Sequence, residues 1–193
     1  MVKKPKDYGI IAEGCIESEI VQSEVFQNNL SFNSNPTGRP EKILGVHIGK
    51  ILDFIEGQGW DRYRPNLRLM ALLHDIGKPY VKRSLSGNVV GLGHTRISEQ
   101  IAEDFLDDAS VLRLIVIHDR YKHFFDDCAC GRLNLEKFAR VYRGADLDTL
   151  ARFHYADSND RSKDSSKWVD DKFVELGLRE GAPIYATDFI VLS

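Results

Sequence analysis

The sequence has no long apolar segment. No hydrophobic run approaches the roughly 18 residues that a membrane-spanning helix requires. The chain starts Met1-Val2-Lys3-Lys4-Pro5-Lys6, and no apolar stretch typical of a secretory signal peptide follows. We therefore expect a soluble, cytoplasmic protein without a membrane partner.

Cysteine is also scarce. The three cysteines, Cys15, Cys128 and Cys130, are an odd number, and one residue between the last two is too short for an unstrained disulfide. We expect reduced thiols. A zinc site built on the Cys128 and Cys130 pair would need two more ligands, and only His123 is near in sequence, so we interpret this segment as a plain loop.

An excess of positive charge is absent as well. The formal net charge is −3 and the isoelectric point is near 6.1. Proteins that hold nucleic acid backbones or anionic membranes over a wide surface need a basic field, which this composition does not provide. A local basic cluster could still hold a single phosphate group.

The chain is long enough for one domain. Its 193 residues are 42% hydrophobic, which is enough to fill a sizeable core, and no repeat, low-complexity block or linker divides it. We predict a mainly α protein that forms a single-domain helical bundle. Residues 1–40 are expected to form a partly irregular N-terminal extension, residues 41–165 the main domain, and residues 166–193 a C-terminal helix and tail packed on the same domain.

Apolar residues recur at helical spacing through most of the chain. Thr95 is the expected N-cap of the helix that starts near Gly93. Residues 80–92 indicate a small hairpin or loop excursion, and the stretch after Gly181 is expected to form a short strand or to pack irregularly. The predicted helices are 16–26, 41–55, 66–75, 95–106, 109–119, 133–141, 147–157 and 166–178.

The strongest motif is the stretch Leu72-Leu73-His74-Asp75-Ile76-Gly77-Lys78-Pro79 at the end of a predicted apolar helix. Helical spacing from Met70 places His74 on the buried face. An imidazole and a carboxylate in an apolar interior are costly unless they are satisfied, and a divalent metal satisfies both. The alternative is a buried histidine with an ordinary hydrogen bond beside an aspartate that ends the helix.

Other histidines favour the metal. All six lie between residues 47 and 154, and His47, His74 and His118 fall on apolar helical stripes. Together with Asp75 and Asp157 they indicate a mixed nitrogen and oxygen site built across a helical bundle. Such a site suits manganese, iron, nickel, cobalt or zinc better than calcium, and magnesium is also compatible. The sequence leaves open whether one ion or two are bound.

The order of these residues resembles a known family. His47, then His74-Asp75, then the distal Asp157 is similar to the H…HD…D signature of the HD-domain metal-dependent phosphohydrolases. The resemblance covers about residues 41–165 and implies that these four residues bind a catalytic divalent ion within a helical fold.

Within that superfamily, one subgroup is more similar. Gly93-His94 at a helix start, Ile117-His118-Asp119, and the run 150–157 followed by Arg161 resemble the HD domain of bacterial CCA-adding tRNA nucleotidyltransferases. No nucleotidyltransferase head precedes this region, so we do not expect CCA addition. The resemblance to deoxynucleotide triphosphohydrolases is limited to the four ligands, and the Gly-Tyr-Pro motif of the cyclic dinucleotide hydrolases is absent.

The resemblance also suggests roles beyond the four ligands. His94 and His118 are similar to the extra ligands of two-metal members, in which the aspartate of the pair bridges the ions. Alternatively, they contact the substrate phosphate or a bound water. Asp119 could orient the attacking water or fix the tautomer of a histidine, or it could be a surface carboxylate that ends a helix.

Basic side chains are candidates for phosphate contacts. Lys78 follows the motif on a glycine turn and is a candidate for the catalytic and substrate-binding set, although an exposed lysine is the simpler interpretation. Arg161, one turn beyond Asp157, is a second candidate. His123 and His154 are expected to be supporting or structural residues.

The expected function is hydrolysis of a phosphomonoester, a phosphoanhydride or a 2′,3′-cyclic phosphate of a nucleotide or an RNA end, through a metal-activated water. The partner is then a small phosphorylated substrate, and the oligomeric state stays open. The alternative is a non-catalytic HD module that binds a nucleotide or a partner protein and carries a structural metal.

Overall fold

The computed structural model describes residues 4–33, 43–82, 91–158 and 164–187. Within these ranges the protein is mainly helical, as expected, and its only β pairing is an isolated bridge between Asn33 and Ile43. No described helix is long and apolar enough to cross a membrane. The α-helices are α1 (Gly14–Gln22), α2 (Glu24–Asn29), α3 (Leu44–Glu56), α4 (Arg64–Leu73), α5 (His94–Ala102), α6 (Ala109–Ile117), α7 (Arg120–Ala129), α8 (Leu135–Tyr142), α9 (Leu147–Asp157), α10 (Asp164–Glu175) and α11 (Ile184–Thr187).

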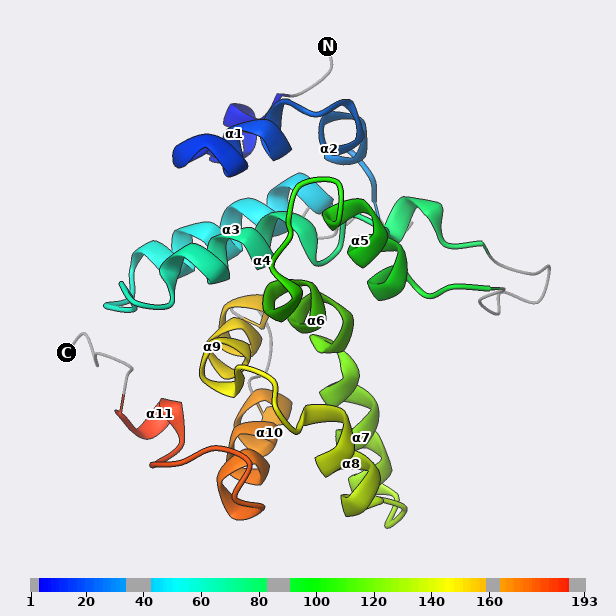
Figure 1. Cartoon of the computed structure of the whole chain (residues 1–193), viewed down its shortest axis with the longest axis vertical. Helices are drawn as coiled ribbons and strands as arrows, with labels where there is room; N and C mark the ends of the chain where they lie inside the picture. The colour runs from blue at the N-terminus through cyan, green and yellow to red at the C-terminus, as the bar shows by residue number, and fades with distance from the viewer. Residues whose placement is uncertain (1–3, 34–42, 83–90, 159–163, 188–193) are drawn as a thin grey trace.

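Helix α4 is the centre of the bundle. It packs against α3, α5, α6 and α9. Helix α10 instead packs against α9 and α7. In Figure 1, α1 and α2 lie at one end of the molecule and α7, α8 and α10 at the other. The side chains of α4 are buried around most of the helix, which is expected when neighbours surround it. Its C-terminal end therefore delivers the next residues into the interior.

Short polar side chains fix where several helices begin. The carboxylate of Asp108 accepts hydrogen bonds from the backbone N–H groups of Ser110 and Val111 at the start of α6. Asp146 does the same for Thr149 at the start of α9. Such caps satisfy N–H groups that the helix itself leaves unpaired, and each is typically worth about 1 kcal/mol. They set the register of the two helices that carry site residues at their C-terminal ends.

The N-terminal segment is attached to the bundle by a buried ion pair. The Arg68 guanidinium of α4 donates to both carboxylate oxygens of Glu17, at 2.9 and 2.8 Å, and also to Glu56 of α3 at 2.6 Å. Arg68 is 3% exposed and Glu17 5% exposed, so loss of Arg68 would leave the buried Glu17 carboxylate without its cation. The interaction ties α1 to α3 and α4.

Glycines of α3 permit a second close contact with this segment. A Cβ atom at Gly49 would lie 2.1 Å from the backbone oxygen of Tyr8, and one at Gly45 would lie 2.8 Å from the Tyr8 ring. Any other residue at either position would push residues 5–8 away from α3. The first turn of α3, which carries His47, is therefore covered by the N-terminal segment.

Some local predictions were wrong. Thr95 lies inside α5, and Gly93 is the N-cap. The single helix predicted at 16–26 is two helices, because Ser23 interrupts α1 and its hydroxyl caps α2. In the stretch after Gly181, residues 184–187 form the short helix α11 rather than a strand, and residues 188–193 lie outside the described residues. Residues 34–42, which include the start of the helix predicted at 41–55, lie outside the described residues, and so does the tip of the predicted excursion at 83–90.

The prediction of a loop around Cys128 and Cys130 was also wrong in part. Cys128 lies in the last turn of α7 and Cys130 caps that helix. Among the described residues, neither cysteine belongs to a group of three ligand-type side chains close enough to share an ion. The cysteines are free thiols in the structure.

The contact at Gly49 gives a test of the N-terminal packing. We expect Gly49→Ala to lower the free energy of unfolding by about 1–3 kcal/mol, because the added methyl group meets rigid backbone rather than a flexible side chain. Chemical denaturation monitored by circular dichroism measures the change. Gly59→Ala is the matched control, since a Cβ there has no neighbour within 4 Å. Equal stability of both variants would contradict the close packing of Tyr8 on α3.

Candidate metal centre

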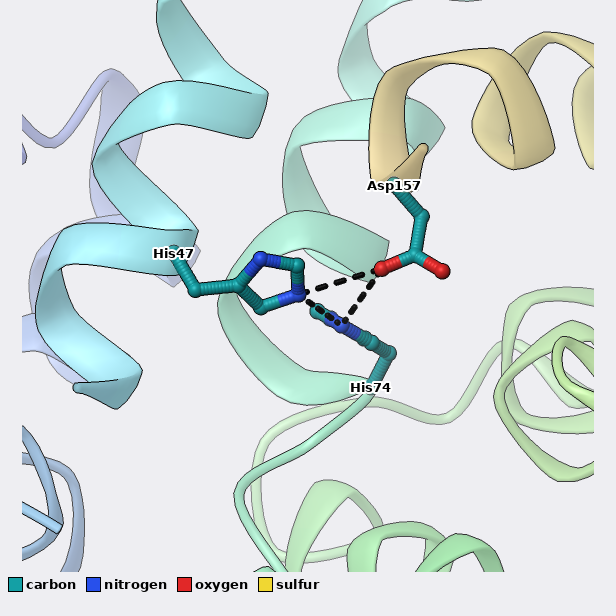
Figure 2. Close-up of side chains that lie close together, drawn as sticks. All are labelled: His47, His74 and Asp157. Atoms are coloured by element: carbon teal, nitrogen blue, oxygen red, sulfur yellow. Dashed lines mark hydrogen bonds and ion pairs between the residues drawn. The ribbon is translucent and has the colours of Figure 1, made fainter. Parts of the chain in front are cut away.

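Three chain segments far apart in sequence meet beside the end of α4. His47 lies in the first turn of α3, His74 and Asp75 directly follow α4, and Asp157 is the last residue of α9. All four side chains are buried. Figure 2 shows the side chains of His47, His74 and Asp157 pointing toward one another. We call these three residues the His47 group.

The polar atoms of the His47 group lie close enough to share one ion. The Nε2 atoms of His47 and His74 are 3.3 Å apart, and Oδ1 of Asp157 lies 3.1 Å from Nε2 of His47 and 3.7 Å from Nε2 of His74. Oδ2 of Asp75 joins them at 3.2 Å from Nε2 of His74. Two imidazoles and two carboxylates thus converge on one small volume.

Backbone carbonyls orient two of the imidazole rings. Nδ1 of His74 lies 3.1 Å from the carbonyl of Met70, and Nδ1 of His118 lies 2.7 Å from the carbonyl of Ile115. A carbonyl only accepts, so each Nδ1 atom carries a proton. In the neutral ring the Nε2 lone pair then remains free, which is the usual arrangement of a histidine that binds a metal.

A second group of ligand-type side chains adjoins the first. His94 begins α5, His118 follows α6, and Asp119 is the N-cap of α7. Their ligand atoms lie within 4.8 Å of one another. His94 is 23% exposed and Asp119 21% exposed, so this second group faces solvent more than the first. We call these three residues the His118 group.

Asp75 lies between the two groups. Its Oδ2 atom faces His74 of the His47 group, while its Oδ1 atom lies 3.4 Å from Nε2 of His94 and 3.8 Å from Nε2 of His118. Oδ1 is buried and accepts no hydrogen bond from the described residues. Buried carboxylate oxygens normally have a partner, and a cation between Asp75 and the His118 group would provide one.

The carboxylates are ionised despite their burial. Burial favours the neutral acid, but His74 and Lys78 outweigh it and hold the pKa of Asp75 well below its usual range. For Asp157, burial is outweighed by Lys122 and His47, and its pKa is also well below the usual range. The site therefore presents two anionic ligands at neutral pH.

The imidazoles of the His118 group are neutral at the same pH. Burial, with a contribution from His74, lowers the pKa of His118 to about 4. Burial also lowers the pKa of His94. Neutral imidazoles beside ionised carboxylates form the donor set that divalent transition metals prefer, because both ligand types must be unprotonated to bind.

Lys122 is a site residue that sequence analysis missed. It lies in the first turn of α7, and its Nζ atom is 3.2 Å from Oδ2 of Asp157. Burial alone would lower the pKa of Lys122, but Asp157 and other nearby acidic groups raise it above its usual value. The sequence has no spacing signal for it, because His118 ends α6 whereas Lys122 lies on the next helix, α7.

The remaining predicted residues are Lys78, Arg161, His123 and His154. Lys78 contacts Oδ2 of Asp75 from the turn after the motif, and Arg161 lies outside the described residues. His123 is exposed. His154 is fully buried, and its ring packs on Tyr121 with centroids 4.1 Å apart, so it supports the core behind the site.

The residues present fit a divalent ion. The fit rests on converging imidazole nitrogens and carboxylates, and on the buried Asp75 oxygen without a partner among the described residues. Calcium prefers oxygen ligands alone, so the mixed set favours a transition metal. The arrangement suits one ion in the His47 group and a second between Asp75 and the His118 group.

Comparison with protein families adds an independent finding. Residues 45–152, more than half of the chain, match the HD domain. The chain belongs to the HD domain family. Comparison with curated proteins gave no match, and neither did comparison with solved structures. HD domains bind divalent metals and are typically metal-dependent phosphohydrolases.

The family match and the geometry complement each other. The matched HD domain includes His47, His74 and Asp75, but it ends at residue 152, before Asp157. The structure places Asp157 beside those residues because α9 packs against α3 and α4. Asp157 thus reaches the candidate site from outside the matched range.

We expect stability to depend on pH through His154. Burial lowers its pKa to about 3, whereas an unfolded histidine titrates near 6.5. Between these values the unfolded chain binds more protons than the folded protein, so stability falls as the pH drops from about 6.5 toward 3. At pH 5 the loss from this group is about 2 kcal/mol relative to pH 7.5.

Unfolding measured at pH 7.5 and pH 5 for the parent and His154→Phe checks this prediction. The variant should lose less stability between the two values, because phenylalanine fills the site without titrating. His123→Asn, at an exposed histidine, should behave like the parent. The same pH sensitivity in His154→Phe as in the parent would contradict the prediction.

We also expect manganese to stabilise the protein through Asp75. A ligand that binds only the folded state at a concentration a hundredfold above its Kd should raise Tm by about 5–10 °C for a chain of this size. Asp75→Asn should abolish the rise, because the amide carries no charge to hold the ion. Thermal unfolding with chelator and with manganese measures the effect. The control Asp53→Asn changes an exposed carboxylate on α3 and should keep the full rise in Tm. A full rise in Tm for Asp75→Asn would mean that the ion binds elsewhere.

Proposed function

We propose that the chain is a metal-dependent phosphohydrolase that acts on a nucleotide or on a terminal or 2′,3′-cyclic phosphate of an RNA end. The observation that carries the proposal is the position of Asp75. Its two carboxylate oxygens face two adjoining groups of histidines. That arrangement suits ions that hold and activate a phosphate substrate. Membership of the HD domain family supports hydrolysis in general.

The geometry supports the proposed ligands. His47, His74, Asp75 and Asp157 would hold one ion, and His94 and His118 would hold a second together with Asp75. A divalent ion supplies Lewis acidity, which lowers the pKa of water and offsets the negative charge of a phosphoryl group. The proposed metal is manganese, iron, nickel, cobalt or zinc, with magnesium also compatible.

The protein's own side chains would position water and substrate. Asp119 is ionisable, partly exposed and 3.5 Å from His94, so it can accept a proton from the attacking water or orient it. Lys78 is 32% exposed at its side chain and can reach an incoming phosphate from the solvent side. Lys122 offers a second ammonium group near Asp157, and Arg161 is retained as a candidate from its sequence position alone.

The substrate class is a finer part of the proposal. The resemblance of His94, His118-Asp119 and residues 150–157 to the HD domain of CCA-adding enzymes supports a nucleotide or an RNA end. The partly exposed His94 and Asp119 give such a substrate access to the His118 group.

A substrate panel tests the function. Nucleoside mono-, di- and triphosphates, 2′,3′-cyclic nucleotides and RNA with a terminal or cyclic phosphate are incubated with manganese, nickel, cobalt, iron, zinc or magnesium, and released phosphate or the opened ring is measured. We expect turnover of at least one class, with a loss of about 100-fold or more in Asp75→Asn, since the ion can no longer be held.

Asp53→Asn is the control, because it changes an exposed carboxylate on α3 without touching the site. Absence of turnover on every substrate, with metal shown to be bound by elemental analysis, would reject the enzyme proposal. It would favour a non-catalytic HD module in which the metal is structural.

A further inference from the structure

Two lysines contact the two buried carboxylates of the metal centre. Lys78 pairs with Asp75 and Lys122 pairs with Asp157. The two lysine side chains are 32% and 41% exposed, whereas both aspartates are nearly inaccessible. Each ammonium group therefore lies at the boundary between the buried ligands and solvent. The structure thus gives each anionic ligand a cation of its own.

The two pairs differ in which carboxylate oxygen they use. Lys122 contacts Oδ2 of Asp157, and the other oxygen, Oδ1, is the one that lies 3.1 Å from Nε2 of His47. The ammonium of Lys122 therefore occupies the side of this carboxylate that faces away from the imidazoles. An ion bound by the His47 group can use Oδ1 while Lys122 stays in place.

Lys78 is placed differently. It contacts Oδ2 of Asp75, and this same oxygen lies 3.2 Å from Nε2 of His74 and 3.7 Å from Nε2 of His47. The ammonium therefore binds the oxygen that an ion in the His47 group would use. Two cations on one oxygen repel each other, so the contact of Lys78 opposes binding of an ion at this oxygen.

We propose that the Lys78 ammonium substitutes for the ion in the metal-free protein and competes with it for Oδ2 of Asp75, whereas Lys122 does not compete. This inference rests on the metal centre of the proposed function. Binding of the ion would release Lys78 toward solvent, where its ammonium group becomes free to contact a phosphate. Metal binding would thereby prepare the substrate contact.

The competition has a measurable consequence. If Lys78 must leave its carboxylate before the ion binds, then part of the ion's binding free energy is used to break that contact. Replacing Lys78 by methionine removes the competitor. Replacing Lys122 by methionine removes the same charge from the other carboxylate without freeing a ligating oxygen. Comparison of the two variants separates competition from the general effect of one positive charge fewer.

Calorimetric titration of metal-free parent, Lys78→Met and Lys122→Met with manganese tests the proposal. We expect Lys78→Met to bind the ion about tenfold more tightly than Lys122→Met, the equivalent of one charge-assisted hydrogen bond that no longer has to be broken. Lys78→Arg retains a competing cation and should bind manganese close to the parental affinity. Lys78→Gln, which is neutral, replaces Lys78→Met if that variant fails to fold.

Equal manganese affinities of Lys78→Met and Lys122→Met would overturn the competition and leave the proposed function standing. Weaker binding by Lys78→Met than by the parent would overturn it as well. Failure of the parent itself to bind any of the divalent ions would instead reject the metal centre, and the competition with it. The readout is metal affinity, so the result does not depend on finding a substrate.

Discussion

The burial of two ionised carboxylates at the centre of a helical bundle is the constraint on which the site depends. Asp75 and Asp157 lie almost without solvent contact, and an isolated anion in such a position would be very unfavourable. Both keep their charge because imidazole and ammonium groups surround them. The fold must therefore hold these partners within a few ångströms, which explains why three helices end or begin at the same point.

Helix α4 is placed to meet that requirement. Its apolar surface packs against four other helices, so its C-terminal end is fixed relative to all of them. His74 and Asp75 follow at once, and the carbonyl of Met70 within α4 orients the His74 ring. The buried C-terminal end of α4 thus belongs to the core and also positions the candidate metal ligands His74 and Asp75.

The N-terminal segment, which lies outside the matched HD domain, packs on the two helices that lead to the site, α3 and α4. Arg68 of α4 holds Glu17 in the interior, and Gly45 and Gly49 let Tyr8 approach the backbone of α3. These contacts cover the turn of α3 that carries His47. The described part of residues 1–40 is mostly helical and packs on the bundle, where the sequence predicted a partly irregular extension.

The sequence predicted the helical fold class, the ends of most helices within a few residues, and the residues that could bind metal. These predictions depend on local information: apolar spacing, capping residues, and the presence of histidine and aspartate on apolar stripes. Local errors arose where two solutions were equally compatible with the pattern. Ser23 could continue one helix or cap the next, and Thr95 could cap α5 or lie within it.

What the sequence by itself determined was which residues have the chemistry and which face of a helix they occupy. Only the tertiary structure decided which of them meet. The distance of 3.1 Å between His47 and Asp157 depends on how α9 packs against α3, across more than a hundred residues of chain. The choice of carboxylate oxygen by Lys78 and Lys122 depends likewise on side-chain directions set by packing. Helical periodicity fixes angles within one helix and carries no information about the distance between two.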